Sequence, residues 1–312
     1  MSELAERLRF EPRDGTVIRT PPGSGYGYWV GGHKVTHDPA TGRYVLFYRE
    51  RRPLEYGRGG SCAVAVSDDG VEFETVWSAD KSAFDASSLE VGHVVRHSDR
   101  EWRLYISYER AGTDTWRIDM LSAADPSQFD AQTRRTVLQP QHFGLPWIKD
   151  PWIVRTDGGG YDLYAAVPAR QEAALDGDLI AIGPEDATVL AASEDGVYFE
   201  TVEYVYEAAM DGSWHGHRGR LDCLFPFESG WVGTFSGGRT MFDNYEEPCG
   251  LLAGPDRSTL KRIDTGGPWV RSPYGIVRYV YGLPVGGSLY FYYEYTTEDG
   301  SHELRVSVVD PS

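Results

Sequence analysis

A short strand pattern rich in aromatic residues recurs five times along the 312-residue chain. Its copies begin at residues 44, 102, 161, 231 and 289, so successive copies start 58, 59, 70 and 58 residues apart. An apolar strand precedes each copy, and a polar loop and a strand of small residues follow it. The copies are Tyr44–Glu50, Trp102–Glu109, Tyr161–Ala166, Trp231–Phe235 and Leu289–Glu294. Four short strands per repeat and five repeats indicate a five-bladed β-propeller.

The strand after the aromatic one repeats as well. Residues 63–76 are echoed by residues 189–202, both with an Asp-Gly turn, and weaker copies occupy 118–125, 250–256 and 304–310. Helical periodicity is confined to residues 2–9 and 169–176. A pair of β-sandwiches is the alternative, but sandwiches do not repeat one four-strand unit with its turn in the same place. We therefore predict an all-β fold with four-stranded blades.

The ends of the chain suggest how such a ring closes. The last repeat stops after its third strand, at Asp310, whereas residues 8–19 precede the first blade and could supply the missing outer strand. Pairing the two ends would remove an exposed sheet edge. We predict a single propeller domain over residues 1–312, with a closure segment at 1–30. The predicted blades are about 31–77, 91–138, 148–204, 217–263 and 274–310.

The composition excludes several classes of partner and cofactor. Acidic residues outnumber basic ones 47 to 30, a formal net charge of −17, which argues against nucleic-acid binding. No apolar run is long enough to span a bilayer, and the N-terminus has no apolar signal-peptide core. Three cysteines without a CxxC spacing favour neither a disulfide framework nor a zinc knuckle, so a cytoplasmic location is expected. Dinucleotide, phosphate-loop and nucleophile-elbow motifs are missing, so we expect no cofactor. The oligomeric state is not indicated.

One face of the predicted propeller carries the long loops. The loops between second and third strands are long and charged, whereas opposite turns such as 39–42 and 156–160 are short. The first strands begin on the long-loop face, near residues 32, 92, 149, 219 and 274. Long loops beside short ones usually mark the functional side. A plain scaffold without a site is the alternative.

The segment Ile148–Tyr164 resembles the five-bladed glycoside hydrolases and related sugar-active propellers, including families 32, 43, 68, 117 and 130. In these families an Asp-Pro opens a central strand, and an Asp-Gly turn and a Tyr-x-Leu-Tyr strand follow. The Ser-x-Asp-Gly-x-x-Phe turns at Ser67–Phe73 and Ser193–Phe199 fit the same group. The resemblance covers the architecture of nearly the whole chain, but of the catalytic motif it covers only Asp150.

The family 43 pattern implies that Asp150 orients the substrate and tunes the acid. The blade-one base would fall at Gly32 or His33, since Asp38-Pro39 lies in a turn on the far face. The blade-four acid would fall in residues 214–222, where this chain has His and Arg instead of Glu. Either a different acid/base pair is used, or the protein does not hydrolyse glycosides.

Carboxylates and histidines on the long-loop face are the candidates for this chemistry. Family 117 uses a histidine as acid, which gives a precedent for substitution. The paired Glu246-Glu247 is either a functional pair or a solvated acidic loop. We predict as catalytic Asp150, Glu109, His217 and His33. We predict as substrate-binding His93, Glu50, Arg49, Arg52, Arg58, Lys149, Trp147, Trp214, His215, Arg218, Arg239 and Glu294.

A metal is not expected. His215 and His217 could hold one with Asp211 or Asp222, but no third ligand has a telling spacing. We therefore predict a glycosidase-like enzyme that acts on a small glycoside or oligosaccharide in a central pocket, by acid/base chemistry with a non-standard residue set. The alternative is a non-hydrolytic sugar-binding or biosynthetic propeller protein that has lost glycosidase activity.

Overall fold

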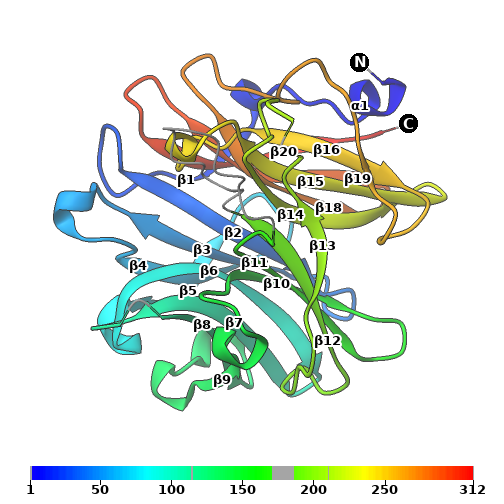
Figure 1. Ribbon diagram of the computed structural model, residues 1–312. Coiled ribbons are helices and arrows are strands. Elements are labelled where there is room, and N and C mark those ends of the chain that lie inside the picture. The colour runs from blue at the N-terminus through cyan, green and yellow to red at the C-terminus, as the bar shows by residue number, and fades with distance from the viewer. Residues whose placement is uncertain (1, 114, 171–185, 210, 312) are drawn as a thin grey trace.

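The computed structural model describes residues 2–113, 115–170, 186–209 and 211–311, which form a mostly β structure (Figure 1). The helix predicted at residues 2–9 is present as α1 (Glu3–Arg7), where the Ser2 hydroxyl accepts a hydrogen bond from the Ala5 amide. The second helical pattern, at 169–176, lies mostly outside the described residues. No helix in the described part of the chain is long and apolar enough to cross a membrane.

Strand pairing groups the strands into antiparallel units of four. Unit 1 contains β2 (Trp29–His37), β3 (Tyr44–Arg51), β4 (Ser61–Ser67) and β5 (Glu74–Asp80). Unit 2 contains β6 (Ala86–Ser98), β7 (Glu101–Arg110), β8 (Trp116–Ala123) and β9 (Arg135–Leu138). Unit 3 contains β10 (Lys149–Arg155), β11 (Tyr161–Val167), β12 (Ala187–Ser193) and β13 (Glu203–Glu207). Unit 4 contains β14 (Arg218–Phe227), β15 (Gly230–Gly238), β16 (Cys249–Gly254) and β17 (Lys261–Arg262).

Unit 5 combines both ends of the chain. It contains β18 (Val277–Val285), β19 (Ser288–Thr296), β20 (His302–Val309) and β1 (Thr16–Arg19). Strand β1 pairs antiparallel with β20, and Thr16 lies opposite Val306. A parallel pairing of Trp29 with His302 also joins β2 to β20, so units 1 and 5 form one sheet. Figure 1 shows the two termini close together at this edge of the molecule.

Apolar side chains fill the layers between neighbouring units rather than one central core. Phe47 and Val64 of unit 1 share a cluster with Leu104 of unit 2, for example. Along these strands inward and outward side chains alternate, which buries one face of each sheet against the next. The first strands of the units pack against one another in the pairs β2–β6, β6–β10, β14–β18 and β18–β2, and we call β2, β6, β10, β14 and β18 the innermost strands.

Each innermost strand carries an irregularity at the same level. The register with the second strand shifts at Gly31–Lys34, Leu89–Gly92, Lys149–Trp152, Leu221–Cys223 and Arg278–Tyr281. Such a bulge adds one unpaired residue and re-aims the side chains beside it. The five bulges therefore decide which side chains face the centre.

The N-terminal segment is expected to stabilise the whole molecule. Phe10 stacks on Phe291 at 5.0 Å and meets Trp269 edge-on at 5.4 Å. Deletion of residues 1–19 should lower the melting temperature markedly, and Phe10→Ala alone should cost about 3–5 kcal/mol. Val17→Ala, at a position with 41% exposure, is the control and should change little. An unchanged melting temperature after the deletion would show that β1 does not hold unit 5 in place.

Candidate functional site

Thirteen charged side chains converge where the innermost strands meet, and we call them the central cluster. Its cations are Lys34, Arg49, Arg51, Lys149, Arg218, Arg220 and Arg278. Its anions are Glu90, Asp150, Asp186, Asp222, Glu247 and Glu294. All except the half-buried Lys149 are buried. Because isolated buried charges are costly, these groups lie close to partners of opposite sign.

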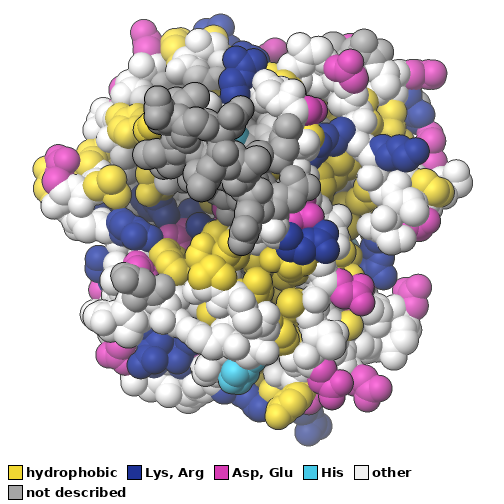
Figure 2. Space-filling view, in the orientation of Figure 1, with side chains coloured by type: hydrophobic (Ala, Val, Ile, Leu, Met, Phe, Trp, Pro, Cys, Tyr) yellow, Lys and Arg dark blue, Asp and Glu magenta, His cyan; other side chains and the backbone are white. Residues whose placement is uncertain are grey.

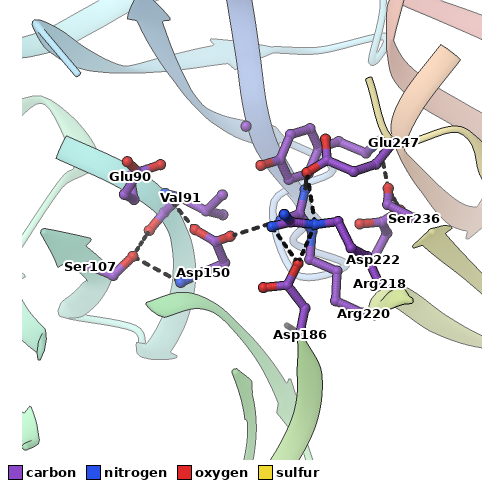
Figure 3. Close-up of polar contacts among 12 residues, drawn as sticks. Glu90, Val91, Ser107, Asp150, Asp186, Arg218, Arg220, Asp222, Ser236 and Glu247 are labelled. Atoms are coloured by element: carbon purple, nitrogen blue, oxygen red, sulfur yellow. Dashed lines mark hydrogen bonds and ion pairs between the residues drawn. The ribbon is translucent and has the colours of Figure 1, made fainter. Parts of the chain in front are cut away.

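Asp150 sits on the bulge of β10 with a positive φ of 56°. This left-handed conformation is uncommon outside glycine, although aspartate and asparagine adopt it more readily than most residues. The Asp150 amide donates to the Ser107 hydroxyl at 2.9 Å, and its Oδ1 accepts from the Val91 amide at 3.4 Å. Its Oδ2 lies 3.8 Å from Arg220 Nη1, as the dashed line in Figure 3 marks. Ser107 thus holds the backbone of Asp150 and Val91 holds its side chain, and the carboxylate has no close ion pair.

The charge state of Asp150 follows from its neighbours. Burial alone would raise the pKa of this carboxyl. The cations Lys149, Arg220 and Arg49 outweigh the effect of burial and hold the pKa of Asp150 below its ordinary value. Asp150 is therefore an ionised carboxylate at neutral pH, suited to orient a hydroxyl or accept a proton.

Glu247 reaches the centre from the loop between β15 and β16. Its carboxylate lies 3.0 Å from Arg278, 3.8 Å from Arg218 and 3.9 Å from Arg220. Burial opposes ionisation, but these three cations lower the pKa of Glu247 to about 2. Its neighbour Glu246 is half-buried, and burial raises its pKa. The predicted Glu-Glu pair is therefore split between a permanent anion and a carboxyl that holds its proton more tightly.

Asp222 is a carboxyl of the central cluster whose pKa is raised. Burial lifts it to about 6, against the opposing charges of Lys34 and Arg220. The Ser236 hydroxyl donates to its Oδ2 at 2.6 Å. Asp222 lies on the bulge of β14, the unit in which family 43 would carry its acid. It therefore changes charge close to neutral pH, as a proton donor must.

Unit 1 has no carboxylate at the place of Asp150. The first bulge residue of β2 is Gly32, which has a φ of 54°. A Cβ atom there would lie 2.5 Å from the Nε of Arg49, and one at Gly31 would overlap the side chain of Glu294. The guanidinium of Arg49 therefore occupies the space that a blade-one aspartate would need. This contact explains why the family pattern does not carry over to unit 1.

The remaining carboxylates of the central cluster are engaged in close contacts. Glu90 forms ion pairs with Arg49 and, at 2.8 Å, with Arg51. Glu294 binds Arg278 at 2.7 Å and accepts a hydrogen bond from the Gly32 amide at 2.8 Å. These groups hold the inner strands together and have little freedom to act on a substrate.

A second group of predicted residues lies at the rim formed by units 1 to 3. Arg58 pairs with Glu109 at 3.5 Å and lies over the ring of Trp116 at 5.2 Å. The Lys149 ammonium lies over Trp116 at 5.5 Å and over Trp147 at 5.0 Å. The structure therefore brings the predicted Arg58, Glu109 and Trp147 next to the central cluster.

Two predicted histidines do not lie beside the Asp150 carboxylate. His33 is fully buried beside Glu294 and the Tyr292 backbone, and burial lowers its pKa to about 4. His93 accepts a hydrogen bond from the Ile153 amide at 2.9 Å and contacts the Thr36 hydroxyl at 2.9 Å. It lines a cavity of about 570 Å³ with the short turn at residues 37–39, on the face opposite the long loops. The contacts described for these two histidines are with groups other than Asp150, and a shared pocket with Asp150 stays a prediction.

Other predicted residues lie further out. Glu50 points away from the centre because it alternates with Arg49 and Arg51 on β3, and it lines a separate pocket of about 200 Å³ with Arg52. Trp214 and Arg239 line another pocket, of about 280 Å³, together with Glu246. His215 packs on Trp214 and Phe235, and the His217 amide donates to the Gly238 carbonyl. No group of three potential metal ligands occurs among the described residues.

A pocket of about 410 Å³ adjoins the central cluster on the long-loop face. Its lining includes Tyr26, Trp29, Arg51, Arg58 and Tyr245. The Trp29 and Tyr245 rings lie 5.3 Å apart. Figure 2 shows hydrophobic and basic side chains gathered in a hollow near the middle of this face. Apolar rings beside cations suit a sugar that also carries polar or charged groups.

Sequence reasoning missed Arg220, Asp222 and Asp186 as site residues. The sequence analysis placed Arg220 only near the start of a first strand, and it considered Asp222 only as a possible metal ligand. Asp186 binds Arg218 at 2.8 Å from just before β12. A bulge leaves no pattern in a single sequence, so the sequence did not show that these side chains face the centre.

No protein-family model and no curated protein matches the sequence. Solved structures do match it in three dimensions. A glycoside hydrolase aligns with a TM-score of 0.71 at 10% identity, covering 100% of this chain and 96% of its own. A thermostable family-43 glycoside hydrolase aligns at 0.65 and 14% identity, covering 94% and 91%. The β-1,2-mannobiose phosphorylase from Listeria innocua, solved with β-1,2-mannobiose, aligns at 0.60 and 14% identity, covering 95% and 93%.

The chain has the fold of these glycoside hydrolases. The resemblance inferred from Asp150 and its surroundings is thereby confirmed at the level of the fold. At 10–14% identity the likeness does not extend to the reaction, because one fold can carry many different sites.

The glycine at the bulge of β2 can be tested directly. Gly32→Ala should destabilise the protein by about 1–3 kcal/mol more than Gly42→Ala, because overpacking against Arg49 adds to the backbone cost. Gly42 is the matched control, since it also has a positive φ, 75°, but no atom lies within 4 Å of its Cβ position. Denaturant unfolding of both variants measures the difference. Equal losses would mean that Arg49 yields its place readily.

Proposed function

We propose that the protein is a glycosidase-like enzyme that acts on a small glycoside or oligosaccharide at the long-loop end of the central cluster. The observation that carries the proposal is Asp150, an ionised, buried carboxylate held at φ 56° where units 2, 3 and 4 meet. Strained backbone at a buried charge is characteristic of functional sites. The fold shared with glycoside hydrolases and a phosphorylase supports the same class of reaction.

The architecture proposed for this enzyme is a single five-bladed propeller over residues 1–312. Each four-stranded unit would be one blade, and β1 would complete the fifth blade and close the ring. The pairing of β1 with β20 supports this closure. In such a ring the five bulges would surround one channel, with the long loops at its open end.

The proposed chemistry divides the two acid/base roles between Asp150 and Asp222. Glycoside cleavage needs a proton donor at the leaving oxygen and a carboxylate that faces the anomeric carbon or an attacking water. Neighbouring charges lower the pKa of Asp150, whereas burial raises that of Asp222 to about 6. Environments that separate two carboxyl pKa values in this way commonly mark a base and an acid. In this scheme Glu109, which accepts from Ser87 at 2.8 Å, contacts substrate at the rim.

A non-hydrolytic sugar-binding protein is the second candidate function. Arg49 fills the place of the blade-one base, and Glu90 and Glu294 are held in close ion pairs. A panel of aryl-glycosides, with and without phosphate, separates the two functions. Turnover supports the enzyme, whereas sugar binding without any turnover supports the binding protein.

Asp150→Asn should abolish most of the activity and leave the fold intact. Asparagine has the same size and tolerates a positive φ, so neither a cavity nor strain is added. Loss of the charge should lower kcat/KM by about 10²- to 10⁴-fold. Asp162→Asn is the control, because Asp162 is buried on β11 and binds Arg257 away from the central cluster. Full activity in folded Asp150→Asn protein would remove Asp150 from the mechanism.

The proposed acid predicts the pH dependence. Asp222 donates only while it is protonated, that is, below its pKa of about 6, so kcat/KM should fall as the pH rises through 6. Asp150 stays ionised over this range because its pKa is lowered. The residual kcat/KM of Asp222→Asn should not show this fall above pH 6. If kcat/KM of the variant still falls as the pH rises through 6, a group other than Asp222 is the acid.

A further inference from the structure

Arg220 has an unoccupied hydrogen-bonding edge in the middle of the central cluster. Its side chain is buried, with 5% exposure, and its guanidinium lies over the ring of Tyr279 at 4.5 Å. Within the described part of the chain, neither Nε nor Nη2 has a hydrogen-bond acceptor. The nearest carboxylate oxygens, on Asp150 and Glu247, lie 3.8 and 3.9 Å from its terminal nitrogens, beyond hydrogen-bond length.

The two nitrogens without acceptors form one recognition edge. Nε–H and one Nη–H of a guanidinium point in the same direction and match two oxygens of a carboxylate or phosphate. Stacking on Tyr279 fixes the plane of this fork. A buried charged donor without an acceptor is costly, so the edge is expected to be used by a bound group.

Two other arginines of the central cluster differ from Arg220 in this respect. Arg278 donates to Glu294 at 2.7 Å and to Glu247 at 3.0 Å, and Arg218 donates to Asp186 at 3.0 Å. Their forks therefore bind protein carboxylates. Figure 3 shows Arg220 among Asp150, Asp186 and Glu247.

The balance of charge favours an anion at this point. The described residues of the central cluster supply seven cations and six anions, although the whole chain has a formal charge of −17. The pocket next to the cluster adds Arg58 and Arg52, which also lines the smaller outer pocket, against one carboxylate, Glu55. Cations concentrated inside an acidic protein attract an anionic ligand to that place.

We propose that the Nε–Nη2 edge of Arg220 binds an oxyanion in the active site, either the carboxylate of an acidic sugar or an inorganic phosphate. The proposal rests on the proposed function, because it places this anion next to Asp150. It restricts the substrates to uronic-acid-type glycosides or to reactions in which phosphate is a co-substrate.

Binding measurements test the inference without the need for turnover. Glucuronate and galacturonate are compared with glucose and galactose, and phosphate with chloride at equal ionic strength, by calorimetry and thermal shift. We expect one class of anion to bind wild-type protein and Arg220→Lys to weaken it at least tenfold, since lysine keeps the charge but lacks the fork. Arg103→Lys is the control, because Arg103 is a buried arginine that binds Glu101 at 2.7 Å outside the central cluster.

Tighter binding of the uronates identifies the ligand of Arg220 as a sugar carboxylate, whereas tighter binding of phosphate identifies it as a phosphate co-substrate. Binding of neither anion, or equal binding to Arg220→Lys, overturns the inference. Turnover measurements then distinguish failure of the anion-site inference from failure of the proposed enzymatic function. If wild-type protein cleaves neutral glycosides without phosphate, and Arg220→Lys cleaves them equally well, the proposed enzymatic function stands and the proposed anion site is rejected. If anion binding depends on Arg220 but no glycoside is turned over, the anion site stands and the proposed enzymatic function is rejected.

Discussion

Pairing of buried charges at the centre is the constraint on which the rest of the structure depends. Apolar layers bring neighbouring units together but do not specify how their innermost strands meet. Ion pairs do, because an unpaired buried charge costs several kcal/mol. Arg51 of unit 1 binds Glu90 of unit 2, Asp150 of unit 3 faces Arg220 of unit 4, and Arg278 of unit 5 binds Glu247 of unit 4. The Gly32 amide of unit 1 also donates to Glu294 of unit 5, and the Val91 amide of unit 2 donates to Asp150 of unit 3, so all five units are linked through the same cluster.

Bulges with the same backbone conformation carry different side chains in different units. Three bulge residues share a left-handed conformation, namely Gly32, Asp150 and Tyr279, with φ values of 54°, 56° and 51°. One is a glycine that makes room for Arg49, one is the central carboxylate, and one is the ring on which Arg220 stacks. The strained geometry is thus common to three units, whereas the side chain it presents is specific to each.

Sequence reasoning found the strands well, because alternation of apolar and polar residues is a local signal. The aromatic segment predicted at 44–50 is β3 (Tyr44–Arg51), and that at 102–109 lies within β7 (Glu101–Arg110). The facing of side chains near the bulges was harder to predict. One unpaired residue reverses the alternation, so Lys34 reaches the Asp222 carbonyl in the central cluster while His33 is buried beside Glu294. A bulge leaves no pattern in a single sequence, which is why His33 was favoured and Arg220 was overlooked.

Two carboxylates of the central cluster, Glu247 and Asp186, come from connecting segments, whereas Glu90, Asp150, Asp222 and Glu294 lie on strands. Arg218, Arg220 and Arg278 lie on innermost strands, whereas their partners Glu247 and Asp186 come from the connecting segments before β16 and β12. Strand positions are fixed by the sheets, but connecting segments can change without loss of the fold. Replacement of one loop carboxylate would free a second arginine fork and change the ligand charge that the centre accepts. In the proposed scheme the loop carboxylates that neutralise the inner arginines therefore decide which ligand charge is accepted, and among the described residues Nε and Nη2 of Arg220 have no hydrogen-bond acceptor.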